Sequence, residues 1–412
     1  MNEYPQLFNL ARPLDFPLMF FRWSQMEVFQ SELKGGTWGS LHRLLFLRGP
    51  FTGYGVFLLV GGFAAVQMFR RDWRRRSLHP LSVVALYFLT YTAVLALTQD
   101  YEAERYYVPV LLVGSILVAA GLLHAVRTVR GWWGQRAAPE GAEPLTLAGH
   151  ARLEAPGPAV AARQPAWLQG GRGLALVWCL PALLALVALT VQVFRAPYVP
   201  QETGWLLASY EAAALTHHDV ADWRAWEQAR FSHYGTLEPT LGKLLVGFPI
   251  FWAVQAWDAA AELPVGLYDD QAAFATNQFD NRVPSDRLLF AARAGVALFG
   301  LAAVLAITAL GLLVGGRATA LLAGGVSALT PFITAHFARA LPDAHHALFL
   351  LLALAALMLA ATRKQVLARL AAMGAFGVLA ALAAGVKLVS AVVLPLMAVL
   401  VIGALLWFRR QG

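Results

Sequence analysis

The chain has 412 residues, of which 58% are hydrophobic and only 14% are charged, and its formal net charge is +8. Soluble domains carry about 25% charged residues, whereas apolar runs of about 20 residues, the length that crosses a bilayer, recur here from Phe51 to Phe408. This composition excludes an ordinary soluble protein. It predicts an all-α fold, a polytopic membrane helical bundle.

The apolar runs predict about nine transmembrane helices. In chain order they lie near 52–69, 80–98, 107–127, 174–194, 289–314, 318–336, 343–361, 366–384 and 387–408. Residues 1–134 then form a three-helix membrane part and residues 173–412 a six-helix part. Residues 135–172 are rich in Ala, Gly, Pro and Arg, which is typical of a flexible linker.

The basic residues predict the orientation of the chain, because they cluster beside the apolar runs as the positive-inside rule describes. The clusters are Arg70, Arg71, Arg74, Arg75 and Arg76; Arg127, Arg130 and Arg136; Arg363, Lys364 and Arg369; and Arg409 and Arg410. Placing them inside makes the linker and the C-terminus cytoplasmic and the N-terminus external. Residues 195–288 become a large external loop, in which the apolar stretch 241–257 is expected to lie as an interfacial helix.

The same pattern explains the net charge, so the sequence gives no indication of nucleic-acid binding. Membrane lipids are the expected surroundings. The predicted location is a bacterial or archaeal plasma membrane, with the chain as a multi-pass integral protein.

Four ionisable residues lie at the predicted external ends of the helices. They are Glu202, Arg293, Asp343 and Lys387. Charged groups at such depths are costly and usually face a cavity or a partner. Each residue alone has a structural explanation: Asp343 could cap a helix, Lys387 could extend to the headgroups, Arg293 could pair with an acid, and Glu202 could be solvated. Four on one face favour a functional site.

Residues 174–408 resemble the N-terminal part of the GT-C superfamily of membrane glycosyltransferases. The branch is the protein O-mannosyltransferase and aminoarabinose-transferase type. The resemblance rests on five features in the order found in that family: an acid after a helix at Glu202; Leu237-Glu238-Pro239-Thr240-Leu241-Gly242-Lys243; Arg293-Ala294-Gly295 early in a helix; Thr330-Pro331-Phe332 followed by Ala338-Arg339-Ala340-Leu341-Pro342-Asp343; and Gly385-Val386-Lys387 before an apolar run.

The sequence departs from the family pattern in two motifs and in the order of its parts. Gln201 stands where the family usually has a second acid, and Glu238-Pro239-Thr240 replaces His-Pro-Pro. Residues 104–109, Glu-Arg-Tyr-Tyr-Val-Pro, resemble a late family segment although they come first here. The order is that of a natural fusion, a permuted arrangement or an artefact of gene prediction.

The resemblance implies an inverting sugar transfer from a polyprenyl- or dolichyl-phosphate donor to an acceptor on the external face. Glu202 would be the catalytic base, and Asp343 would orient the acceptor or a metal ion. Arg293 and Lys387, with Arg105 as a further candidate, would bind the lipid phosphate. Substrate-binding roles would fall to Glu238, Lys243 and His345.

The sequence is also compatible with use of a divalent metal ion and with two other functions, a membrane transporter and an inactive scaffold. Some relatives use a divalent metal ion, which Glu202, Asp343 and His345 could hold. The sugar and the acceptor are not indicated. A membrane transporter would require broken helices at matching positions in two halves, which the apolar interiors of 343–361 and 387–408 do not favour. The missing acid and the unusual order favour an inactive GT-C-like fragment or scaffold.

Overall fold

The computed structural model describes residues 66–67, 69–70, 72, 74, 79–98, 108–136, 168, 170–196, 198–209, 240–251, 264, 267–269, 271–363 and 365–410. All regular elements in this part of the chain are helices. They are α5 (Pro80–Thr98), α6 (Val108–Arg136), α7 (Gly170–Arg195), α8 (Pro200–Ala208), α12 (Thr240–Phe251), α13 (Phe274–Phe279), α14 (Asp286–Gly315), α15 (Arg317–Leu329), α16 (Pro331–Ala338), α17 (Asp343–Thr362), α18 (Val366–Val386) and α19 (Val389–Arg410).

Five of these helices are long and apolar enough to cross a membrane: α7, α14, α17, α18 and α19. The prediction of a helical membrane protein is therefore confirmed. The predicted count of nine spans is not, because within the described residues α5 and α6 hold only shorter apolar stretches, Pro80–Tyr91 and Leu111–Leu123. The predicted first span, 52–69, lies almost wholly outside the described residues.

The expected span at 318–336 is two shorter helices, α15 and α16, and this is a correction to the sequence prediction. Thr330, between them, has the extended conformation φ −81°, ψ 109°. Proline disfavours the helical conformation of the residue before it, so Pro331 ends α15 at this point and begins α16 as its first residue.

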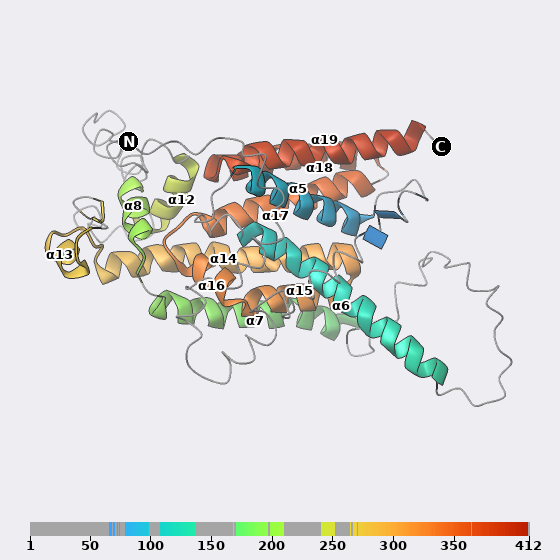
Figure 1. The fold of residues 1–412 in the computed structure, drawn as a ribbon, viewed down its shortest axis with the longest axis horizontal. Helices are drawn as coiled ribbons and strands as arrows, with labels where there is room; N and C mark the ends of the chain where they lie inside the picture. The colour runs from blue at the N-terminus through green and yellow to red at the C-terminus, as the bar shows by residue number, and fades with distance from the viewer. Residues whose placement is uncertain are drawn as a thin grey trace.

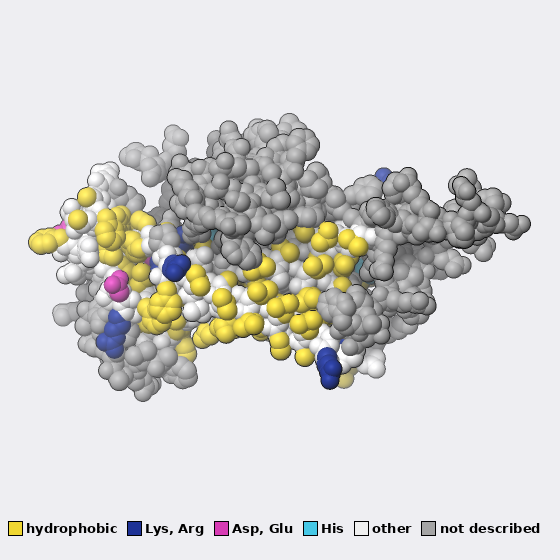
Figure 2. Space-filling view, turned by 90° about the horizontal axis from the view of Figure 1, so that it is seen from below, with side chains coloured by type: hydrophobic (Ala, Val, Ile, Leu, Met, Phe, Trp, Pro, Cys, Tyr) yellow, Lys and Arg dark blue, Asp and Glu magenta, His cyan; other side chains and the backbone are white. Residues whose placement is uncertain are grey.

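The surface of α7 shows why the helices suit a bilayer. Its buried residues recur every fourth position, from Gly173 through Val177 and Pro181 to Val193. Apolar residues also cover the opposite side, including Leu183 at 57% and Phe194 at 69% exposure. In Figure 2 hydrophobic side chains cover the middle of the described surface, and charged side chains lie toward its two ends. An apolar exterior between polar ends is the pattern of a lipid-facing surface.

The two parts predicted on either side of the linker pack into one bundle. α6 lies along α15, and α5 packs between α6 and α19. Buried residues of α5, α6, α14, α17 and α19 belong to one hydrophobic core. A hydrogen bond of 3.0 Å between the hydroxyl groups of Ser115 and Ser327 joins α6 to α15. Most of the predicted linker lies outside the described residues, and its ends differ from prediction: α6 continues to Arg136 and α7 begins at Gly170.

The short helices α8, α12 and α13 gather at one end of the bundle, opposite the end that holds the C-terminus (Figure 1). α14 and α17 begin at this end, and the junction between α18 and α19 returns to it. We call it the α8 end.

Candidate functional site

A buried ion pair joins α8 to α14 at the α8 end. Glu202, in the first turn of α8, is fully buried, and Arg293, two turns into α14, is 4% exposed. The guanidinium donates two hydrogen bonds to the carboxylate, Nε to Oε1 at 2.8 Å and Nη2 to Oε2 at 2.7 Å. Its Nη1 donates to the carbonyl of Ala196 at 2.8 Å. This two-pronged geometry is the strongest form of a carboxylate–arginine contact.

Backbone amides complete the environment of the Glu202 carboxylate. The N–H of Ala340 donates to Oε1 at 2.8 Å, and the N–H of Val199 donates to Oε2 at 3.1 Å in a helix-capping contact. Both oxygens therefore accept two hydrogen bonds each, so in this conformation the carboxylate is already satisfied. Glu202 thereby ties α8, α14 and the turn before α17 together.

A second buried ion pair lies at the start of α17. Lys387, at the junction of α18 and α19, contacts the carboxylate of Asp343 through its Nζ. Asp343 is 1% exposed and Lys387 is 2% exposed. Two residues in the same elements extend this contact: His346 Nε2 and the hydroxyl of Ser390 share a hydrogen bond of 2.7 Å. The Asp343–Lys387 pair therefore joins the start of α17 to the junction between α18 and α19.

The turn between the two pairs holds a third buried cation, Arg339. This residue comes directly before Ala340, which bonds Glu202, and four residues before Asp343. The residue is 6% exposed, and its Nε is buried with no hydrogen-bond partner. Among the described residues no carboxylate pairs with this guanidinium, in contrast to Arg293. Arg339 belongs to one of the motifs that carry the family resemblance, but the resemblance assigns it no role.

Lys243 lies at the same end, on α12, and is 2% exposed. α12 packs against α8, α14 and α18. The neighbouring Gly242 lies against the Trp205 ring and the carbonyl oxygen of Val386. The structure therefore brings Lys243 to the end of the bundle that holds the two ion pairs. Arg105 and Glu238, which were also predicted there, lie outside the described residues.

His345 does not join a metal-binding group in the described part of the chain. Its ring packs at a tilt of 44° against the ring of Phe299, with centroids 4.0 Å apart, and both ring nitrogens are buried without a hydrogen-bond partner. No group of three His, Cys, Asp or Glu residues suited to a metal ion occurs among the described residues. A divalent metal held by Glu202, Asp343 and His345 stays a prediction.

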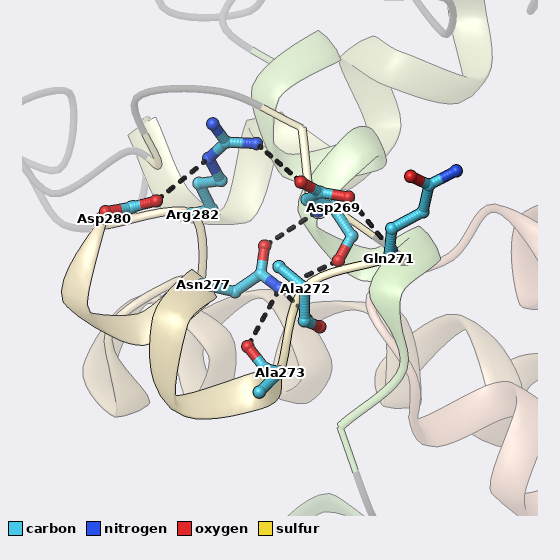
Figure 3. A network of polar contacts seen from close by, with 7 residues as sticks. All are labelled: Asp269, Gln271, Ala272, Ala273, Asn277, Asp280 and Arg282. Carbon is cyan, nitrogen blue, oxygen red and sulfur yellow. Dashed lines mark hydrogen bonds and ion pairs between the residues drawn. The ribbon is translucent and has the colours of Figure 1, made fainter.

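A network of polar contacts holds the turn around α13 together (Figure 3). The side chain of Asn277 in α13 accepts from the N–H of Asp269 at 2.7 Å and donates to its carbonyl oxygen at 2.9 Å. The carbonyl of Arg282 accepts from the hydroxyl of Thr203 at 3.1 Å. Thr203 follows Glu202 directly and also contacts the hydroxyl of Tyr198. The turn is thus attached to the helix that carries the buried acid.

These features define the chain as a helical membrane protein with a cluster of buried charges at one end of its bundle. Comparisons with protein-family models, with curated proteins and with solved structures gave no match.

Proposed function

We propose that the chain is a membrane glycosyltransferase that takes a sugar from a polyprenyl- or dolichyl-phosphate donor and transfers it to an acceptor on the external face. One observation carries this proposal: two carboxylates and four cations are buried at the same end of a lipid-facing bundle. Buried charges at the ends of membrane helices are costly and mark functional sites. A carboxylate can take the proton of the acceptor, and cations can stabilise the negative charge on the departing lipid phosphate.

The proposed reaction forms one bond and breaks one. The acceptor oxygen attacks the anomeric carbon, and the bond from that carbon to the phosphate oxygen breaks with inversion. The acceptor proton passes to a carboxylate, for which Glu202 is the proposed base and Asp343 the proposed acceptor-orienting group. A positioned base contributes about 10²–10⁴-fold. The electron pair leaves on the lipid phosphate, whose growing charge cations stabilise.

In the resting structure the ion pairs hold both proposed catalytic carboxylates. Glu202 accepts four hydrogen bonds in the resting structure, so it can take a proton only after some of them break. A bound lipid phosphate would compete with Glu202 for Arg293 and with Asp343 for Lys387. Donor binding would thereby free the carboxylates for the acceptor, which links base activation to the presence of the donor.

The first test of the function is donor selectivity. The purified protein in detergent is incubated with a polyprenyl-phosphate sugar or with the matching nucleotide sugar, and release of polyprenyl phosphate or nucleotide is measured. We expect turnover only with the lipid donor. Turnover with the nucleotide sugar alone would contradict the proposal.

The saturated carboxylate of Glu202 favours a second candidate, an inactive scaffold of glycosyltransferase-like architecture. In this reading both ion pairs only hold the helices together. It predicts no turnover with either donor, together with unchanged melting temperature when polyprenyl phosphate is added. Stabilisation by polyprenyl phosphate would contradict the scaffold.

A further inference from the structure

We propose that Arg339 is an anion-binding residue that receives the phosphate group of a polyprenyl-phosphate lipid. The inference rests on the proposed function and adds a residue that the resemblance did not assign. It starts from the difference between Arg339 and two buried cations that pair with acids: Arg293 is neutralised by Glu202 and Lys387 by Asp343. In the described structure Arg339 has no such partner.

A buried guanidinium without a partner is energetically unfavourable. Arginine stays charged in proteins, and removing one charge from water without a counter-charge costs several kcal/mol. Proteins therefore pair buried charges or use them to bind a ligand. Of the guanidinium nitrogens only Nε is fully buried without a partner, and the residue as a whole stays 6% exposed, so an anion can approach the group. Because guanidinium matches phosphate with two parallel hydrogen bonds, a phosphate is the anion it fits best.

The position of Arg339 connects this anion to the rest of the site. Its neighbour Ala340 donates to Glu202, and Asp343 follows at the start of α17. The turn is short and held by a hydrogen bond from the N–H of Leu341 to the carbonyl oxygen of Arg339 at 2.7 Å. A phosphate bound at Arg339 would thus lie on the turn between the proposed base and the proposed acceptor-orienting acid. That is where the leaving group of the reaction would sit.

A binding experiment without turnover tests the inference. Polyprenyl phosphate is titrated into the wild-type protein and an Arg339→Met variant in phosphate-free detergent, and the dissociation constant and melting temperature are measured. Inorganic phosphate, phosphatidylglycerol and neutral polyprenol are titrated in parallel. Charge-assisted hydrogen bonds are worth about 1.5–3 kcal/mol, so we expect Arg339→Met to weaken polyprenyl-phosphate binding at least about tenfold. Arg339→Lys should retain part of the affinity.

The melting temperature without ligand separates binding from a structural role. If Arg339 is kept for a ligand, replacing the unpaired buried charge with an apolar side chain of similar length should raise the melting temperature. A structural arginine would lower it. Arg282→Met is the matched control, because Arg282 is a half-exposed arginine at the same end of the bundle. It should leave polyprenyl-phosphate affinity within about twofold, as screened surface charges contribute little.

The binding results distinguish failure of the Arg339 inference from failure of the proposed function. If the wild type binds polyprenyl phosphate and Arg339→Met binds it equally well, the inference is wrong while the proposed donor class stands. If the wild type does not bind polyprenyl phosphate, the proposed function fails. Equal affinity for inorganic phosphate or phosphatidylglycerol would overturn the assignment to a polyprenyl lipid.

Discussion

At the scale of single residues, the contact between Glu202 and Arg293 makes a quantitative prediction. Removing one partner of a buried ion pair leaves the other charge unpaired and costs about 3–5 kcal/mol. Glu202→Gln and Arg293→Met should therefore each destabilise the protein by about this amount. The double variant should be more stable than the sum of the single effects predicts, with a coupling free energy of about 1–3 kcal/mol. Reversible unfolding of the four proteins in detergent measures it.

The control for this cycle is the contact between Asp280 and Arg282. These side chains are 3.9 Å apart and more than a third exposed. Exposed pairs are worth about 0–1 kcal/mol, so a cycle with Asp280→Asn and Arg282→Met should show little coupling. Equal coupling in both cycles would mean that the Glu202–Arg293 contact is not held in a low-dielectric interior.

At the scale of elements, two adjacent glycines of α15 make opposite predictions. A Cβ on Gly324 would lie 2.9 Å from Cβ of Pro181 in α7 and still closer to the hydroxyl of Thr308 in α14, whereas a Cβ on Gly325 meets nothing within 4 Å. Gly324→Ala should destabilise the bundle by about 1–3 kcal/mol through overpacking. Gly325→Ala should be neutral or stabilising by up to about 1 kcal/mol, because alanine favours the helix. Similar melting temperatures for the two variants would contradict the close packing of α15 on α7 and α14.

At the scale of the whole molecule, the bundle predicts which segments lie on opposite sides of a membrane. α17 begins at the α8 end and spans the bundle, so α13 and Gln365 should lie on opposite sides. Because Cys179 is the single cysteine, Cys179→Ser gives a background for new labels. In intact cells a membrane-impermeant maleimide should label Gln278→Cys, while Gln365→Cys should react only after permeabilisation. Labelling of both in intact cells would show that α17 does not cross, and the reverse pattern would invert the proposed orientation.

The sequence by itself determined the class of protein and which charged residues lie near the ends of apolar helices. Apolar runs long enough to cross a bilayer are a local property, so α7, α14, α17, α18 and α19 could be predicted within a few residues. Local signals also placed Glu202, Arg293, Asp343 and Lys387 near helix ends. The break at Thr330 was a local signal too, carried by Pro331, but the apolar residues on both sides of it predicted a single span over 318–336.

Only the tertiary structure decided which of these charges meet. Glu202 and Arg293 are 91 residues apart, and Asp343 and Lys387 are 44 apart, so no local pattern specifies either pairing. The resemblance gave Glu202 the role of base, Asp343 the orientation of the acceptor or a metal ion, and Arg293 and Lys387 the lipid phosphate. The fold instead joins these acids and cations in pairs. The same packing leaves Arg339 buried without a counter-charge. Whether a buried cation is neutralised depends on which side chains the helices bring within a few ångströms, and that is a property of the assembled bundle alone.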